Sequence, residues 1–333
     1  MDNAIVMTGV ESKSKVNGLT LKLIAIIAMF IDHFSAIILQ SKYIEAAVTS
    51  PSEEAFKAWV AANPGWTYIP FALRMVGRFA FPIFVFLMIE GFVHTRSRKK
   101  YAINLAVFAL ISEIPFNLGF SGKFFYLGYQ SVYMTLLIGL LSLCVIEEFG
   151  FKRQWSDKFS MLAYPVSMIL GGCIGAILFK YDNGNYINSI LNLPHYAIII
   201  GGAVIALLIV LIASRKWDVN KKNQFVVTAA SLVALGGLAE LLKTDYGFVG
   251  VAAMVVMYIN RAKKTKAFAL GCLTLSAFTV FEIPALLMLI PIAKYNGERG
   301  PKVNKYFFYA FYPVHLAILY LIAKMLGITS FIG

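Results

Sequence analysis

Charged residues are scarce in this sequence. Of its 333 residues only 14% are Asp, Glu, Lys or Arg, whereas 59% are hydrophobic. A soluble domain is usually about 25% charged and about 45–50% apolar, so this chain has too little polar surface to cover a soluble globule. No gap between its apolar runs reaches the ~50 residues of a small soluble domain. We therefore predict one membrane-embedded domain over residues 1–333: an all-α polytopic bundle of about ten transmembrane helices with no soluble domain.

Cysteines and the common catalytic motifs of soluble enzymes are scarce as well. Cys144, Cys173 and Cys272 fall inside apolar runs, whereas a disulfide framework would need them paired in exposed loops. The chain has no GxxxxGKS or GxxxxGKT phosphate loop, no HExxH and no CxxC. We therefore expect no metal site.

The apolar runs indicate ten spans, each near the ~18 residues that cross a bilayer. They cover residues 19–40, 67–93, 101–120, 131–149, 159–180, 196–213, 225–242, 247–260, 267–293 and 306–326. The polar tail 1–18 and the long first run argue against a cleaved signal peptide. The eighth span is short and opens with Gly247 and Gly250, so it is a candidate for a tilted, broken or re-entrant segment.

The net charge is +13, and the basic residues are distributed unequally between the two sides of the predicted membrane. With a cytoplasmic N-terminus, 19 of the 30 Lys and Arg residues lie inside, nine lie outside, and Arg74 and Arg78 lie within a span. This bias predicts a multi-pass membrane protein with the N-terminus in the cytoplasm, and no nucleic-acid partner is needed to explain it. The loop 294–305 is the exception, because it places four cations outside. Either the eighth span does not cross, or these cations have a function.

Ionisable residues inside the spans are the strongest functional signal. Each costs at least ~2.5 kcal/mol at the bilayer centre, which makes it a functional candidate. From the ~1.5 Å rise per helical residue, six of them share a layer between the midplane and the outer third: Asp32, His33, Arg78, Glu113, Glu282 and His315. Asp32 or Glu113 could pair with Arg78, and Glu113 could orient His33.

His33 and His315 are the candidate proton-transfer groups, because histidine titrates near neutrality. Each has a structural alternative, since an intramembrane histidine that only bonds a neighbouring helix is common. Glu90 and His94 form a second polar pair, four residues apart, at the cytoplasmic end of the second span. Pro82, between that pair and Arg78, is expected to kink the span. The basic cluster Arg96, Arg98, Lys99 and Lys100 follows His94.

Several segments together resemble one family. They read, in order, LKLIAIIAMFIDHF, GRFAFPIFVFLMIEGFVHTRSRKKY, ISEIPFN, TDYGFVGV, YNGERG and FYPVHL. In this combination the chain resembles the TraX family of integral membrane acetyltransferases, whose namesake acetylates a pilin N-terminus. The resemblance covers residues 20–325. One departure is Gln130-Ser131, which precedes the VxxTLxxG stretch where the family tends to have Asn.

The resemblance implies acyl transfer from acetyl-CoA by a protein of the bacterial cytoplasmic membrane. It does not fix the acceptor, since a peptide N-terminus, another amine or a sugar hydroxyl fits the same chemistry. In this interpretation the catalytic residues are His33, Asp32, Glu113, Arg78 and His315. The residues expected to bind acetyl-CoA are Arg96, Arg98, Lys99, Lys100, Tyr295, Asn296 and Arg299. The residues expected to bind the acceptor are Asp245, Tyr246, Glu90 and His94. His33 would be the general base, and Arg78 or Tyr295 would stabilise the oxyanion.

Two other functions fit parts of the pattern. A secondary transporter would also have many spans, a buried charge layer and an internal repeat, and Glu113-Ile114-Pro115 recurs as Glu282-Ile283-Pro284. A scaffold would use the buried charges only to fix the packing of its helices. Dependence on a substrate gradient would favour the transporter, whereas tolerance of neutral replacements at Asp32 and His33 would favour the scaffold.

Overall fold

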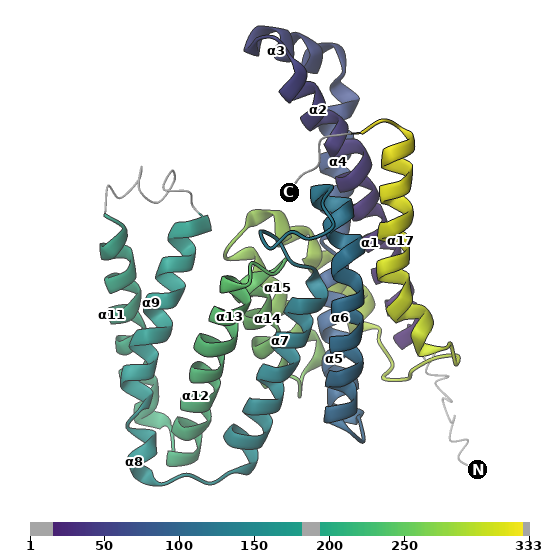
Figure 1. Ribbon diagram of the computed structural model, residues 1–333. Helices are drawn as coiled ribbons and strands as arrows, with labels where there is room; N and C mark the ends of the chain where they lie inside the picture. The colour runs from purple at the N-terminus through teal and green to yellow at the C-terminus, as the bar shows by residue number, and fades with distance from the viewer. Residues whose placement is uncertain (1–15, 182–193, 329–333) are drawn as a thin grey trace, which may run out of the picture.

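The computed structural model describes residues 16–181 and 194–328, and within these ranges the protein is an all-α bundle (Figure 1). In these described ranges, eight helices are long and apolar enough to cross a membrane. They are Gly18–Thr49, Pro64–His94, Arg98–Ser121, Val132–Lys152, Asp157–Lys180, Tyr196–Lys216, Val219–Leu241 and Tyr306–Met325. The predicted fold class is therefore confirmed. Two predicted spans differ, because residues 247–260 and 267–293 form shorter elements.

The first long helix consists of α1 (Gly18–Phe34), η1 (Ser35–Gln40) and α2 (Ser41–Thr49). The next helices are α3 (Glu53–Ala62), α4 (Pro64–Gly77), α5 (Ala80–His94), α6 (Arg98–Ser121), α7 (Val132–Val145), η2 (Ile146–Lys152), α8 (Asp157–Ser160), α9 (Ala163–Tyr181) and α11 (His195–Ala213). The remaining helices are η3 (Ser214–Lys216), α12 (Val219–Ser231), η4 (Leu232–Gly236), α13 (Gly237–Leu241), α14 (Gly247–Ile259), α15 (Lys264–Ser276), η5 (Val280–Met288), α16 (Leu289–Ala293) and α17 (Lys305–Met325). We call the end of the bundle at which α1 begins the N-terminal end.

The second predicted span is broken at Arg78–Phe79, between α4 and α5. Proline has no backbone N–H, so Pro82 cannot donate to the carbonyl of Arg78 four residues earlier. The sequence therefore breaks the helix at the residue that carries a candidate functional side chain.

Helix α14 is short and lies in the middle of the bundle. Nearly every residue from Gly247 to Tyr258 is buried, and its 13 residues rise about 20 Å. Gly247 adopts a positive φ of 46°, and the Glu240 carboxylate accepts the Phe248 N–H at the start of the helix, 3.1 Å away. A helix that is apolar on all sides is typical of such a central position.

The ninth predicted span is a hairpin. Helix α15 rises from the N-terminal end, the chain turns at residues 277–279, and η5 and α16 return alongside α15. Lys264 at the start of α15 donates a hydrogen bond to the carbonyl of Tyr295, just after α16. Both ends of the hairpin therefore lie at the same end of the bundle, and its tip, with Glu282, reaches the interior.

This hairpin corrects the predicted side of the loop 294–305. The Gly18 N–H donates to the Glu298 carbonyl at 2.8 Å, and the Asn296 N–H donates to the Val16 carbonyl at 3.0 Å. The loop therefore lies at the N-terminal end, and α17 runs from there to the opposite end (Figure 1). The exception to the charge bias disappears because the ninth apolar run doubles back.

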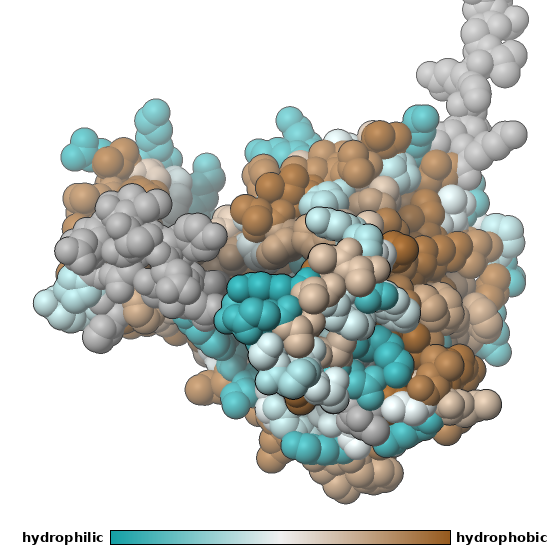
Figure 2. All heavy atoms as spheres, turned by 90° about the horizontal axis from the view of Figure 1, so that it is seen from above, coloured by the Kyte–Doolittle hydropathy of each residue, from teal (hydrophilic) through white to brown (hydrophobic). Residues whose placement is uncertain are grey.

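The flanks of the bundle are apolar, as a lipid environment requires. Helix α11 packs mainly on α9 and exposes the branched side chains Ile200, Val204, Ile205, Leu208, Ile209 and Ile212. Seen from the end opposite the N-terminal end, hydrophilic atoms gather over the middle of the face and hydrophobic atoms lie along much of its edge (Figure 2).

Candidate functional site

An ion-pair network joins α1, the α4–α5 break and the hairpin tip. Arg74 Nη1 lies 2.5 Å from Asp32 Oδ2, and Arg78 Nη2 lies 3.2 Å from Asp32 Oδ1. Arg78 Nη1 also donates to Glu282 Oε1 at 3.0 Å. We name Asp32, Arg74, Arg78 and Glu282 the ion-pair network. Arg78 pairs with Asp32, one of the two predicted partners, and not with Glu113.

Glycine at position 77 allows the network to form. A Cβ atom added to Gly77 would lie 2.0 Å from the Asp32 carboxylate, so no larger residue fits without displacing that side chain. Arg74 and Arg78 flank this contact, one turn apart on the same helix. Two neighbouring cations repel each other, and the carboxylate between them removes that repulsion.

Two acceptor-binding candidates lie beside this network. Asp245 interacts electrostatically with Arg78, Asp32 and Arg74, and accepts a hydrogen bond from the Tyr129 hydroxyl. The Tyr246 ring stacks on Phe81, with 3.7 Å between the ring centroids. The turn before α14 therefore brings a third carboxylate to the interior.

His33 and His315 form a buried pair on another side of α1. His33 Nδ1 lies 2.6 Å from His315 Nε2, and the two rings stack with an interplanar angle of 3°. Only 7% of His33 and 4% of His315 is exposed. His33 also meets the ring edges of Phe120 and Tyr312. Its partner is therefore His315, and the predicted pairing with Glu113 is wrong.

Hydrogen bonding assigns the tautomers of this pair when both rings are neutral. His315 Nδ1 lies 2.7 Å from the Phe311 carbonyl oxygen, which only accepts, so this nitrogen carries the proton. His315 Nε2 then accepts, and His33 Nδ1 must be the donor. The lone pair of a neutral His33 is therefore on Nε2, the nitrogen that a general base uses.

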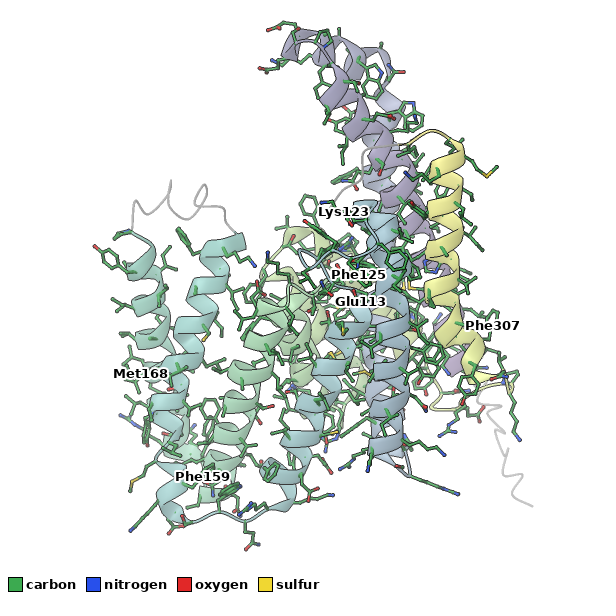
Figure 3. The ribbon with its side chains drawn as sticks, viewed as in Figure 1. Glu113, Lys123, Phe125, Phe159, Met168 and Phe307 are labelled. Atoms are coloured by element: carbon green, nitrogen blue, oxygen red, sulfur yellow. The ribbon has the colours of Figure 1, made fainter. Side chains whose placement is uncertain are left out.

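Glu113 occupies a different place in the bundle. Its Oε1 accepts from the Ser131 hydroxyl at 2.6 Å and from the Ser131 N–H at 3.1 Å. Ser131 is the N-cap residue of α7, and a carboxylate is favourable at a helix N-terminus. Figure 3 shows Glu113 near the connection between α6 and α7. The repeated Glu-Ile-Pro motif thus has two environments: one copy lies in α6, the other in η5 at the hairpin tip.

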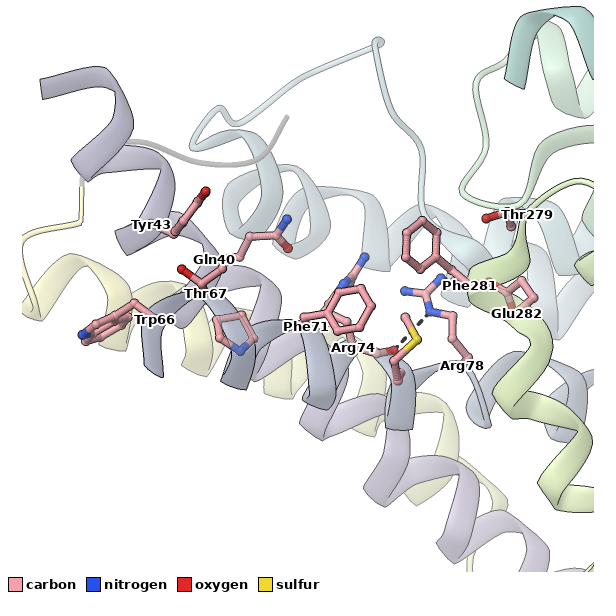
Figure 4. Close-up of a pocket in the computed structure, with 12 residues that line it drawn as sticks. Gln40, Tyr43, Trp66, Thr67, Phe71, Arg74, Arg78, Thr279, Phe281 and Glu282 are labelled. Atoms are coloured by element: carbon pink, nitrogen blue, oxygen red, sulfur yellow. Dashed lines mark hydrogen bonds and ion pairs between the residues drawn. The ribbon is translucent and has the colours of Figure 1, made fainter. Parts of the chain in front are cut away.

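A pocket of about 520 Å³ opens beside the ion-pair network (Figure 4). It lies between the second half of the long first helix, α4 and the hairpin tip. Arg74, Arg78 and Glu282 line one part, and aromatic rings line much of the rest: Tyr43, Trp66, Phe71 and Phe281. Gln40, Thr67 and Thr279 add polar groups.

The residues predicted to bind acetyl-CoA lie at the N-terminal end, in two sets. In the first set, Arg98 is paired with Glu147 at 3.2 Å, and Arg96, Lys99 and Lys100 are exposed. In the second set, Arg299 is exposed and repels the nearby, half-buried Lys22. Neither Lys22 nor Arg299 forms an ion pair with a carboxylate in the described part of the chain. The Lys22 ammonium lies over the Phe308 ring, 5.1 Å from its centroid.

Tyr295 lies beside this second set. Its ring meets the edge of Phe86, with 5.5 Å between the centroids. Burial raises the pKa of the Tyr295 phenol, and the nearby Glu90 carboxylate raises that pKa further. The phenol therefore stays protonated near neutral pH and can donate a hydrogen bond. Asn296, next in the chain, bonds Glu298 through its amide nitrogen at 3.2 Å.

The four predicted acceptor-binding residues are not together. Asp245 and Tyr246 lie near Phe81 at the start of α5, whereas Glu90 and His94 lie near its end. Glu90 is nine positions after Phe81, about 14 Å along the helix. Tyr295 is likewise at the Glu90 end, so it does not share a site with Arg78.

Among the residues of these sites that were not assigned a role from the sequence are Lys22, Gln40, Thr67 and Arg74. Arg74 carried a signal, since it lies four residues before Arg78. Lys22 also carried one, as a cation inside an apolar run. Gln40 and Thr67 lie at span edges, where polar residues are common, so the sequence held no signal for them.

Fold and site define a polytopic, all-α membrane protein with a buried ion-pair network, a buried histidine pair and a pocket. Within that class the chain belongs to the TraX protein family, whose sequence model matches residues 17–184 and 187–323. It is similar to the "Probable fimbrial assembly protein FimC, serogroup H1" of Dichelobacter nodosus, with 26% identity over 311 residues that cover 90% of this chain and 92% of that protein. No solved structure matches the chain.

Proposed function

We propose that this protein is a membrane-embedded acyltransferase that moves an acetyl group from acetyl-CoA to an amine or hydroxyl acceptor. The observation that carries the proposal is the buried histidine pair, in which His315 directs the lone pair of His33 to Nε2. Membership of the TraX family and likeness to a fimbrial assembly protein support a role connected with pilins.

The donor would bind at the N-terminal end, which we propose faces the cytoplasm because the loop 294–305 and the other basic connections gather there. Lys22 and Arg299 are the better phosphate ligands. They are close together and have no carboxylate partner among the described residues, whereas Arg98 is already paired with Glu147. Two unpaired neighbouring cations are stabilised by a phosphate. Tyr295, Asn296, Arg96, Lys99 and Lys100 would contribute around them.

Acetyl-CoA supplies an acetyl group activated as a thioester. His33 Nε2 would accept the proton that the acceptor nitrogen or oxygen loses as it bonds to the thioester carbonyl carbon. The same proton would then pass to the CoA sulfur as the carbon–sulfur bond breaks. Arg78 would stabilise the developing negative charge on the carbonyl oxygen, while Asp32 would hold Arg78 in place.

Thermal stability of the detergent-purified protein tests the donor half of this proposal. A ligand that binds only the folded state adds about 2.7 kcal/mol at a hundredfold excess over its dissociation constant. We expect acetyl-CoA, CoA and adenosine 3′,5′-bisphosphate to raise the melting temperature in a saturable way. Arg299→Gln should weaken this effect, whereas Lys302→Gln in the same loop should not. No shift at millimolar ligand with folded protein would contradict the proposal.

A secondary transporter is the second candidate, and one feature favours it. The hairpin ends its helix α15 inside the bundle and places η5, with Glu282, beside buried charges, and interrupted helices of this kind line many transport sites. Gradient-driven uptake of a solute by vesicles that contain the protein, without acetyl transfer, would favour this alternative.

A further inference from the structure

The pocket beside the ion-pair network contains hydrogen-bond acceptors that no donor in the described chain reaches. Glu282 Oε2, Gln40 Oε1 and Thr67 Oγ1 are buried and have no hydrogen-bond partner among the described residues. All three residues line the pocket. Only 2% of Glu282 is exposed. A buried polar oxygen without a partner is costly, so the pocket favours a ligand that donates hydrogen bonds.

The charges around the pocket add a second constraint. Asp32, Asp245 and Glu282 interact with Arg74 and Arg78, which gives three carboxylates for two guanidinium groups in this part of the described interior. An anion would meet guanidinium groups that are already paired, together with the Glu282 carboxylate, which repels it. A cation would balance the third carboxylate.

The walls of the pocket are also suited to a cation. Tyr43, Trp66, Phe71 and Phe281 line it, and Figure 4 shows Trp66 and Tyr43 at the side away from Glu282. The faces of aromatic rings attract ammonium groups through the ring quadrupole. Hydrogen-bond acceptors, excess negative charge and aromatic walls therefore favour the same kind of ligand.

We infer that this pocket binds an ammonium group, with Glu282 as the residue that selects it and with Gln40 and Thr67 as additional hydrogen-bond acceptors. The ligand would be the acceptor of the acyl transfer, anchored by an ammonium group other than the nitrogen or oxygen that attacks the thioester, because an ammonium nitrogen has no lone pair; that part of the inference rests on the proposed function. Binding of the ammonium group does not depend on it. The pocket and the residues proposed to bind acetyl-CoA, Lys22 and Arg299, are on different sides of the bundle interior. Acetyl-CoA and the acceptor would therefore approach from opposite ends of the bundle.

Binding of benzylamine and benzyl alcohol to the full-length protein tests this inference. The two probes share a ring, but only benzylamine carries an ammonium group at pH 7. Binding is followed by tryptophan fluorescence, since Trp66 lines the pocket. We expect benzylamine to bind at least tenfold more tightly than benzyl alcohol. Glu282→Gln should weaken benzylamine at least tenfold and leave benzyl alcohol unchanged. Thr228→Val on α12, away from the pocket, is the control.

A second variant covers the case in which Glu282→Gln does not fold. The double substitution Gln40→Leu and Thr67→Val removes two acceptors and leaves every ion pair of the network intact, and it should weaken benzylamine severalfold. Equal affinity for the two probes, or benzylamine binding that neither folded variant changes, would overturn the inference.

The failure of this inference can be distinguished from failure of the proposed function. Selective, Glu282-dependent binding of benzylamine without any acetyl transfer would uphold the pocket and reject the transferase. Acetyl transfer from acetyl-CoA that neither benzylamine nor the double substitution alters would uphold the transferase and reject the pocket as its acceptor site.

Discussion

Asp32 and His33 are consecutive residues with different neighbours, because successive side chains on a helix point about 100° apart. Asp32 faces α4 and accepts from Arg74 and Arg78, whereas His33 faces α17 and bonds His315. The sequence could predict that both are buried and functional candidates, since each is ionisable in an apolar run. It could not predict the partners, because these depend on which helices pack together.

The histidine pair gives a prediction at the residue scale. His33→Ala should lower acetyl transfer by at least about a hundredfold in a folded protein, because the general base is lost. His315→Phe keeps a ring between Phe30 and Phe311 but loses the hydrogen bond that directs the lone pair of His33. Its activity should fall by at least about tenfold, as when a histidine loses the group that fixes its tautomer.

The measurement is the rate of acetyl transfer, with melting temperature as the check on folding. Near-normal turnover in His33→Ala would show that another residue is the base. Near-normal turnover in His315→Phe alone would show that His315 contributes only to packing and does not direct the lone pair of His33.

At the scale of elements, the hairpin of α15, η5 and α16 was the largest difference from the sequence-based expectation. Residues 267–293 are almost continuously apolar, and hydropathy alone cannot distinguish one crossing from a hairpin of the same length. Local signals were present: Ser276 and Thr279 interrupt the run, and Pro284 cannot donate a helical hydrogen bond. Element η5 is a 3₁₀ helix of nine residues, and 3₁₀ runs longer than about four residues are uncommon.

The bond between Arg78 and Glu282 fixes the tip of this hairpin, and a double-mutant cycle measures its contribution. Arg78→Gln leaves Glu282 buried without a partner, so it should lower the free energy of unfolding by about 3–5 kcal/mol. Glu282→Gln should lower the free energy of unfolding by less, because Arg78 still forms its ion pair with Asp32. The double variant should lose less than the sum of the two. Chemical denaturation in detergent gives these values, and simple additivity would show that the two side chains do not interact.

At the scale of the whole molecule, the fold class followed from composition, because a chain with so few charges cannot cover a soluble surface. The direction of the last helix did not follow. Each crossing reverses the side of everything after it, so one misassigned hairpin moved the loop 294–305 and the C-terminal end of α17 to the wrong sides. The four cations of that loop were the signal, since they broke a bias that the rest of the chain obeyed.

Cysteine labelling tests this arrangement. In a background without Cys144, Cys173 and Cys272, single cysteines replace Lys99, Glu298 and Met325, all of which are exposed. A membrane-impermeant maleimide is added to intact cells and to permeabilised cells. Lys99→Cys and Glu298→Cys should react from one side, because the α5–α6 connection and the loop 294–305 both lie at the N-terminal end. Met325→Cys should react from the other.

The comparison of Glu298→Cys with Lys99→Cys does not depend on which end faces the cytoplasm. If residues 267–293 crossed the membrane once, Glu298→Cys would react from the side opposite to Lys99→Cys, and Met325→Cys would react from the same side as Lys99→Cys. That result would show that the hairpin is wrong. If Lys99→Cys and Glu298→Cys are both protected in intact cells, the N-terminal end is cytoplasmic. Lys22 and Arg299 would then face the compartment that holds acetyl-CoA, and the pocket with Glu282 would receive its ligand from the other side of the membrane.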